Sequence, residues 1–519
     1  MSVKHDLMTL NGEGMNSQND SSDAPLPGSL KRNTAINLLG ALAPMLVSLL
    51  TLPPYLRVIG EVRFGVLTLV WIVFGYFLVL DLGMGRAMSH HVAKAADPQT
   101  LRKLFWSGVL INGTLGLAGG LLLFSLSHLL MGTLIRVPSE FLVEVRSALP
   151  WLVLAMPLAT IGSVLTGVLE GKERFLTLNL LGVSGAVLSQ VAPLTLALVH
   201  GPGLGGLVAI VTGVRLLSSG LAAVACKRAL PVLGFPCFDR GTARQLLGFG
   251  GWVTVSGVIT PLLGTIDRLM IGAMAGAQAL THYTVPSSLV SRAQIISSSV
   301  ANVLFPRFSQ QERHAAKEGA RLAMRCLAAA MTPTVVIGML VLGAFLEVWV
   351  GHSLAVTAAP IGTVLLIGIW VNSLSWIPFT LLQGLGRPDV TARIHALEVV
   401  PYMGALALGL AVAGPLGAAW AWSLRVVADL GLLFRAARLP LGDLKAIAPA
   451  PVLILATWLC TLLAPGTIQT LVGLSLSCLA IAWSWHVAPP ELRNIVRRLA
   501  VRKRVAPPAP PTPAGSRDR

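Results

Sequence analysis

The chain has 519 residues, of which 54% are hydrophobic and only 12% are Asp, Glu, Lys or Arg, about half the charged share of a soluble domain. A water-soluble fold cannot hide that much apolar surface, so the composition excludes a soluble globular protein and favours one embedded in a lipid bilayer. The formal charge of +17 does not indicate nucleic-acid binding, because the basic residues lie mainly in alternate short connections and in the C-terminal tail.

The predicted elements begin after a polar segment, residues 1–29, which lacks the apolar run and cleavage site of a signal peptide and is predicted to be a disordered cytoplasmic tail. Uncharged stretches of the length that crosses a bilayer, about 20 residues, then follow one another along the chain. Divided at Gly-Pro turns where they are too long, they predict an all-α polytopic membrane protein with about fourteen spans. The predicted spans cover residues 34–56, 64–85, 104–130, 148–169, 176–199, 203–225, 247–271, 280–304, 325–346, 355–382, 391–413, 415–436, 447–464 and 468–487.

An internal duplication groups these spans into two lobes. The segment Leu165–Lys172 at the end of the fourth span resembles Leu382–Arg387 at the end of the tenth, and Gly201–Gly206 resembles Gly414–Ala419 at the start of the sixth and twelfth. An offset of six spans gives both copies the same orientation, as in transporters built from parallel repeats. The predicted organisation is an N-lobe (30–226), a cytoplasmic linker (227–246), a C-lobe (247–437), two further spans (438–487) and a basic, Pro-rich cytoplasmic tail (488–519).

The distribution of basic residues predicts the orientation in the membrane. With the N-terminus in the cytoplasm, 31 of the 39 Lys and Arg residues fall in inner loops and tails, five in outer loops, and three inside spans. Inner loops are enriched in Lys and Arg in membrane proteins, so both termini are predicted to be cytoplasmic.

The sequence offers no support for an enzyme or for an ATP-driven pump. The five cysteines form no CxxC pair, and no metal site or cofactor is predicted. The predicted outer loops are too short for a catalytic domain, and no GxxxxGK[ST] phosphate-binding loop is present. Energy for transport would then come from an ion gradient, the membrane potential or downhill use of the cargo, and the sequence does not choose among these.

Three arginines, Arg215, Arg292 and Arg425, lie near the middle of predicted spans. An arginine at this depth costs roughly 2.5 to 3.5 kcal/mol on insertion scales, so each should face a partner, water or an anionic ligand rather than lipid. Asp429 lies one helical turn after Arg425, which predicts a structural ion pair between them. Arg215 has no acidic neighbour in its own span, and both a cross-helix partner and a cargo contact stay open for it.

Other polar and aromatic positions are candidates for cargo binding, gating or coupling. Arg57 and Arg268 occupy repeat-related outer ends of spans, where they contact either cargo or the membrane interface. Trp370 and Trp376 lie inside a span and are candidate sugar contacts. The gating or coupling candidates are Asp81, Arg86, Asp267 and Glu398.

Two segments resemble a known family. The run Thr51–Gly65 (TLPPYLRVIGEVRFG), followed by Asp81–Arg86 (DLGMGR), resembles the opening of the polysaccharide transporter family, the Wzx-like flippases. Asp267–Gly272 (DRLMIG), with Tyr283, resembles the seventh and eighth spans of the same family. This family shares a superfamily with multidrug extruders and lipid II flippases, and the resemblance covers about residues 30–487.

The resemblance implies two six-helix lobes around a central cavity that opens to one side of the membrane at a time. It implies a protein of the bacterial cytoplasmic membrane that moves an undecaprenyl-pyrophosphate-linked oligosaccharide to the outer leaflet for polysaccharide biosynthesis, such as O-antigen, lipopolysaccharide or exopolysaccharide assembly. Its partners would be this lipid-linked cargo, the bilayer and other polysaccharide-assembly proteins. Because the family places the eighth span on the cavity wall, Arg292 becomes the leading cargo candidate.

Two rival functions remain at this point. An ion-coupled multidrug or toxin extruder of the same superfamily would be expected to carry acidic residues in its first span, and Thr34–Leu56 contains none. A membrane glycan polymerase or ligase is disfavoured by the short outer loops.

Overall fold

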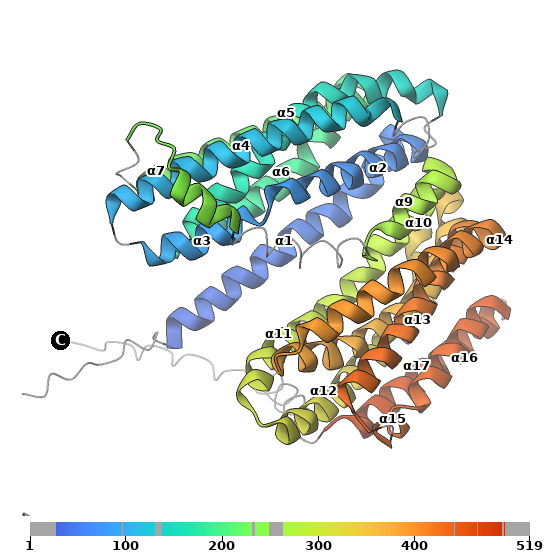
Figure 1. Cartoon of the computed structure of the whole chain (residues 1–519). Helices are drawn as coiled ribbons and strands as arrows, with labels where there is room; N and C mark the ends of the chain where they lie inside the picture. Colours follow the sequence, from blue (N-terminus) through green and yellow to red (C-terminus); the bar gives the residue numbers. More distant parts are fainter. Residues whose placement is uncertain are drawn as a thin grey trace, which may run out of the picture.

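The computed structural model describes residues 27–95, 97–129, 138–230, 234–248, 263–440, 442–463, 466–489 and 493, and the regular structure of these residues is helical. Figure 1 shows two helical bundles that approach each other near α2, α9 and α10 and diverge toward α3 and α7 on one side and α11 and α12 on the other. The first bundle is the N-lobe and the second, with the last helices packed on its flank, is the C-lobe.

The N-lobe is built from the first part of the chain, in which long apolar runs form most of the helices. Its helices are α1 (Pro27–Ile59), α2 (Glu61–Phe77), the 3-10 turn η1 (Leu78–Asp81), α3 (Met84–Lys94), α4 (Pro98–Leu129), the 3-10 turn η3 (Ser139–Phe141), α5 (Leu142–Gly171), α6 (Phe175–His200) and α7 (Leu204–Ala229). The helix α5 packs against α3, α4 and α7 and forms the centre of this bundle.

The C-lobe packs around α13, whose side chains are largely buried. Its helices are α9 (Ile266–Met274), α10 (Gly276–Val290), the 3-10 turn η4 (Ser291–Ala293), α11 (Gln294–Gln310), α12 (Arg313–Val350), α13 (His352–Gly384), α14 (Pro388–Ala437), α15 (Gly442–Lys445), α16 (Pro449–Leu463) and α17 (Gly466–Val487). Helices α16 and α17 pack on α12. Most of the predicted seventh span, residues 249–262, lies outside the described residues.

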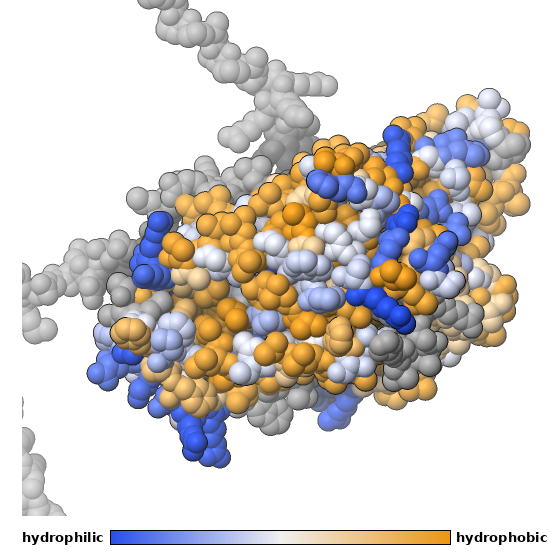
Figure 2. Space-filling view, turned by 90° about the horizontal axis from the view of Figure 1, so that it is seen from above, coloured by the Kyte–Doolittle hydropathy of each residue, from blue (hydrophilic) through white to orange (hydrophobic). Residues whose placement is uncertain are grey.

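The helices confirm an all-α polytopic membrane fold. Eight of the described helices are individually long and apolar enough to cross a bilayer, and α1 and α2 meet the same criterion together around a 118° bend. This bend lies at Gly60, between the first two predicted spans. Figure 2 shows that hydrophobic residues cover much of one face of the molecule, as expected of a surface in contact with lipid.

Two predicted Gly-Pro breaks divide helices as expected. Gly201 ends α6 with a φ of 95°, and Gly414, with a φ of 55°, folds α14 back on itself at the predicted junction of the eleventh and twelfth spans. The two arms of α14 touch where Gly409 meets Gly417, since a Cβ on either residue would overlap the carbonyl oxygen of the other. The third predicted break is Pro465-Gly466, and Pro465 lies outside the described residues.

The span predicted at 64–85 is interrupted, which the hydropathy pattern does not reveal. Helix α2 passes into η1 and then into a left-handed turn at Leu82 and Gly83 before α3 begins. The Asp81 carboxylate accepts hydrogen bonds from Asn112 Nδ2, at 2.5 Å, and from the Ser163 hydroxyl. These contacts tie the interruption to α4 and α5.

The linker that follows α7 is fastened to the N-lobe. The Asp239 carboxylate accepts a hydrogen bond from the backbone N–H of Thr242 at 2.8 Å and lies 3.6 Å from Lys103 Nζ on α4. The Thr242 backbone donor, assisted by the Thr242 hydroxyl and by Lys103, lowers the pKa of Asp239 from its usual value. The Arg102 guanidinium also donates to the carbonyl of Phe235, and the Ser107 hydroxyl accepts the backbone N–H of Asp239, so three residues of α4 hold the linker.

Candidate functional site

A cavity of about 810 Å³ lies between the two lobes and is called the central cavity below. Helices α1, α2, α6 and α7 of the N-lobe and α9 and α10 of the C-lobe contribute its lining, together with Thr265 just before α9. Tyr55, Trp71 and Tyr76 give it aromatic walls, and Gln190 and Ser288 add neutral polar groups. A cavity bounded by both lobes changes shape whenever the lobes move, which is what alternating access requires.

Arg215 on α7 is one of two charged residues among those that line the central cavity. Its guanidinium carbon lies 4.8 Å from the ring centre of Phe74 and 5.7 Å from that of Trp71, within the range of cation–π attraction. Arg215 makes none of the ion pairs found among the described residues. Its guanidinium therefore lies against aromatic rings, and among the described residues no acceptor is found for its hydrogen-bond donors.

Arg268 on α9 is the second charged lining residue and belongs to the C-lobe. Its Nη2 donates to the hydroxyl of Ser287 at 3.2 Å, whereas its buried Nε has no hydrogen-bond partner. No aspartate or glutamate is among the described residues that line the central cavity. The cavity therefore presents two guanidinium groups, one from each lobe, without a lining carboxylate to neutralise them.

The two lobes are joined at the beginning of α2, beyond the central cavity. The Glu61 carboxylate lies 3.0 Å from His282 Nε2 and accepts a hydrogen bond from Gln278 Nε2 at 3.2 Å. One turn later Gly65 touches the backbone of Ala277 so closely that a Cβ on Gly65 would overlap its carbonyl oxygen. These contacts between α2 and α10, called the latch below, close one end of the gap between the lobes.

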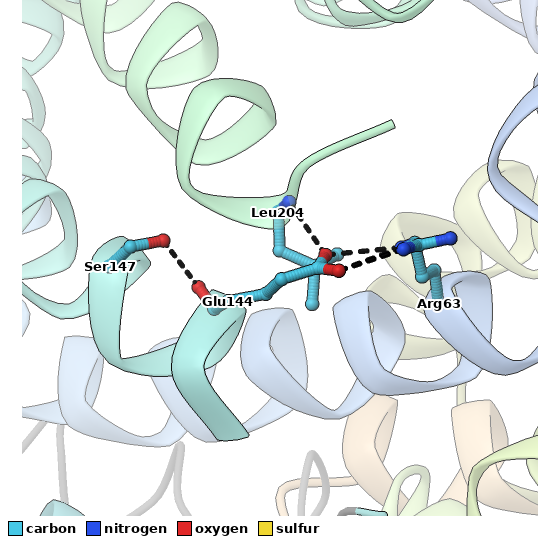
Figure 3. Close-up of polar contacts among 4 residues, drawn as sticks. All are labelled: Arg63, Glu144, Ser147 and Leu204. Carbon is cyan, nitrogen blue, oxygen red and sulfur yellow. Dashed lines mark hydrogen bonds and ion pairs between the residues drawn. The ribbon is translucent and has the colours of Figure 1, made fainter. Parts of the chain in front are cut away.

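The start of α2 is itself held by a second polar cluster within the N-lobe. Figure 3 shows the carboxylate of Glu144 between Arg63 and the backbone N–H of Leu204, the first residue of α7. Arg63 donates from Nη2 and Nε to the two carboxylate oxygens, at 2.8 and 3.1 Å. This bidentate pair connects α2, α5 and α7. It therefore fixes the start of α2, from which Glu61 contacts the C-lobe.

A second cavity of about 340 Å³ lies within the C-lobe and is called the C-lobe cavity below. Its lining includes Asp267, His395, Arg425 and Asp429, and Arg268 lines this cavity as well as the central one. Trp376 also lines it, which places this predicted aromatic candidate at a cavity wall, although not at the central one.

The prediction that Arg425 forms its ion pair with Asp429 is wrong. Arg425 Nη1 lies 3.2 Å from Glu398 Oε2 on the opposite arm of α14, and both side chains are largely buried. Asp429 instead lies 3.5 Å from His395 Nε2. Because α14 folds back at Gly414, Arg425 pairs with Glu398 on the opposite arm rather than with Asp429, which lies one turn along the same helix.

The remaining candidates fall in different places. Trp370 is buried and donates its indole N–H to Thr332, so it faces neither cavity and is corrected to a packing residue. Arg57 is exposed at the end of α1 and lines neither cavity, and Arg86 is exposed on α3. Arg292 lies in η4, where its Nη2 is 3.5 Å from the hydroxyl of Ser48, a residue that does line the central cavity.

Sequence reasoning missed several residues of this arrangement. Trp71 is the aromatic support of Arg215, and Glu61 and His282 form the polar part of the latch. Nothing in the hydropathy pattern separates these positions from other interfacial or mid-span residues. Gly65 was part of the quoted family motif, and its close approach to Ala277 gives that glycine a physical reason.

Comparisons with known proteins bear on this cavity and fold. A family model described as polysaccharide biosynthesis protein matches residues 30–312, more than half of the chain. The chain belongs to this family. It is also 28% identical over 413 residues to a putative O-antigen transporter of Shigella flexneri, covering 78% of this chain and 97% of that protein. The predicted resemblance is thereby confirmed.

Solved structures show the same fold for this family member. A lipid II flippase, MurJ, in an inward closed conformation matches with a TM-score of 0.69 and 12% identity, over 89% of this chain and 100% of that one. An inward-facing multidrug resistance MATE transporter matches with a TM-score of 0.63 and 13% identity, over 80% and 98% of the two chains. The chain is therefore a multi-pass membrane protein that has the fold of these transporters.

Proposed function

We propose that the protein is a flippase that moves an undecaprenyl-pyrophosphate-linked oligosaccharide across the cytoplasmic membrane by alternating access. The observation that carries this proposal is the central cavity, which has Arg215 and Arg268 on opposite lobes and no acidic side chain among its described lining residues. Guanidinium groups form strong, directional hydrogen bonds to phosphate oxygens, so this charge pattern suits a pyrophosphate. The rival multidrug extruder would need the opposite polarity to attract cationic drugs.

The chemistry of the cavity walls also suits the part of the cargo next to the pyrophosphate. Tyr55, Trp71 and Tyr76 supply faces against which sugar rings can pack, and Gln190 and Ser288 supply neutral hydrogen-bonding groups. A volume of about 810 Å³ is within the usual range for small-molecule sites and accommodates the pyrophosphate and adjoining sugars rather than a long glycan. The name of the Shigella relative, a putative O-antigen transporter, supports a glycan cargo.

The latch indicates which side the cavity faces. Under the predicted topology, with both termini in the cytoplasm, the turn between α1 and α2 lies at the outer surface. With this topology the latch closes the outer side. The lobes diverge toward α3, α7, α11 and α12 (Figure 1), and the same topology assigns that end to the cytoplasmic side. This is the state that would receive cargo from the inner leaflet.

The gating and coupling candidates also find a place in this mechanism. Asp267 lines the C-lobe cavity and Glu398 is paired with the lining residue Arg425, so both are proposed to take part in energy coupling. Asp81 and Arg86 flank the turn between η1 and α3 and are proposed to act in movement at the inner side.

The proposed cargo site predicts a graded loss of export. Arg215→Gln and Arg292→Gln should each lower export, and Arg215→Gln combined with Arg268→Gln should lower it at least tenfold. A hydrogen bond to a charged group contributes roughly 1.5 to 3 kcal/mol, which corresponds to roughly 10- to 150-fold in binding. Complementation of a flippase-deficient strain, at matched protein levels, measures the effect.

Arg57→Gln is the matched control, because it removes an exposed arginine outside both cavities. Its export should equal that of the unchanged protein. Wild-type export by the double variant would remove these arginines from the cargo site and overturn the proposal.

The proposed orientation has its own test. Reporter fusions placed after Gly201, at the end of α6, and after Arg240, in the linker, should report the outer and the cytoplasmic side respectively. The predicted excess of Lys and Arg on the inner side is the physical reason for this difference. Reports from the same side at both positions would contradict the topology.

A further inference from the structure

We propose that Arg268 couples the two cavities: an anionic cargo in the central cavity draws its guanidinium away from the C-lobe carboxylates, and these carboxylates then take up a proton. This inference rests on the proposed anionic cargo. It starts from the position of a single side chain, because Arg268 lines both cavities, whereas Arg215 lines only the central one of the two.

The contacts of Arg268 leave its guanidinium free to change partners. Among the described residues, its guanidinium donates to the neutral hydroxyl of Ser287, and its buried Nε has no hydrogen-bond partner. Asp267, the preceding residue, accepts the backbone N–H of Arg268 at 2.8 Å and the hydroxyl of Tyr283 at 2.6 Å. The guanidinium of Arg268 therefore makes none of the ion pairs found among the described residues, although it lines both cavities and shares the C-lobe cavity with Asp267 and Asp429.

The positive charge of Arg268 matters for the charge balance of the C-lobe cavity. Arg425 is paired with Glu398, which leaves Arg268 as the remaining arginine facing Asp267 and Asp429. Removing Arg268 from this balance leaves excess negative charge in a buried site, which favours the neutral form of a carboxyl group.

Two oxygens are placed to receive the proton. Among the described residues, the buried Oε1 atom of Glu398 and Oδ1 atom of Asp429 accept no hydrogen bond, although His395 Nε2 lies 3.5 Å from the latter. The two carboxyl groups come from the facing arms of α14, and Arg425, the partner of Glu398, lies one helical turn before Asp429. Both carboxyl side chains are only 6% exposed. Neighbouring buried carboxyl groups share a proton more readily than they hold two charges. The proton comes from bulk water and adds to one of these oxygens, and no other bond is made or broken.

Other titratable groups lie around Glu398 and Asp429. His395 approaches Asp429 at 3.5 Å and stacks on Phe379, and Tyr402 lies under the guanidinium of Arg425 at 5.3 Å. Tyr283 is already bonded to Asp267. Helix α13 contributes the neutral groups Asn372, Ser375 and Trp376 to this wall. His395 is the group that competes for the same proton.

The test compares ligand binding with proton uptake in the purified full-length protein. Farnesyl pyrophosphate serves as the probe, and calorimetry in two buffers of different ionisation enthalpy gives the protons taken up per ligand bound. The wild type should take up a measurable fraction of one proton. Arg268→Gln should bind at least about tenfold more weakly and, at saturation, take up none.

Arg215→Gln is the matched control, because it removes the same charge from the same central cavity without facing the C-lobe cavity. It should bind more weakly and keep the proton uptake. Arg268→Lys, which keeps a charge at the position, should keep part of it, and a thermal melt of each variant shows that it is folded. Proton uptake that persists in saturated Arg268→Gln overturns the coupling role.

The outcomes separate this inference from the proposed function. A wild type that binds the probe without proton uptake overturns the coupling through Arg268 and leaves the flippase proposal intact. A wild type that does not bind the pyrophosphate contradicts the anionic cargo, and the coupling proposal fails with it.

Discussion

Replacement of Gly65 by leucine is expected to abolish export while the protein still inserts and folds. A Cβ at this position would overlap the carbonyl oxygen of Ala277 across the latch, and backbone atoms cannot yield as a flexible side chain can. The leucine side chain would then hold the two lobes apart on the outer side. The expected result is a cavity that stays open to the outside.

Accessibility measures this effect directly. A cysteine introduced at Thr51, which lines the central cavity, should react from outside with a membrane-impermeant maleimide in Gly65→Leu but not in the parent, in a background without the five native cysteines. Gly220→Leu is the control, because Gly220 lies exposed on α7 with no atom within 4 Å of an added Cβ. Normal export by Gly65→Leu would show that the latch does not need to close.

Arg425→Ala is expected to destabilise the protein strongly. The substitution leaves the buried carboxylate of Glu398 without its 3.2 Å partner, and removal of one member of a buried pair typically costs about 3 to 5 kcal/mol. Arg425→Ala with Glu398→Ala should recover most of that loss in thermal melts in detergent. Arg425→Ala with Asp429→Ala should not, because Asp429 is not the partner. Recovery in the Asp429 combination alone would contradict the observed pairing.

The arrangement of helices was largely predictable because it depends on quantities that a sequence displays. Span length follows from hydropathy, and the fold-back of α14 follows from Gly414 before Pro415, where a positive φ is easily adopted. The repeat offset predicted two lobes because duplicated segments keep the same packing. The interruption after η1 was not predictable, since its cause is a hydrogen-bonding set centred on Asp81 from three different helical segments.

The type of site could be predicted from the sequence, but the partners and directions of individual side chains could not. Arg215, near the middle of a span, and Arg268, at the outer end of a span, were both candidates for a cargo contact, and both line the central cavity. Which partner Arg425 chooses depends on how the two arms of α14 face each other, and that is a tertiary property. Trp370 was placed on the wrong face for the same reason, because span position does not fix the direction of a side chain.

Reconstitution of the purified protein into liposomes that contain a fluorescently labelled undecaprenyl-pyrophosphate oligosaccharide tests the central claim most directly. A membrane-impermeant reductant added outside quenches only label in the outer leaflet, so transfer from the inner leaflet appears as a further loss of fluorescence. The wild type should bleach nearly all of the label, and Arg215→Gln with Arg268→Gln should bleach about as much as protein-free liposomes. A wild type that leaves the inner-leaflet label as protected as protein-free liposomes do would contradict the flippase assignment.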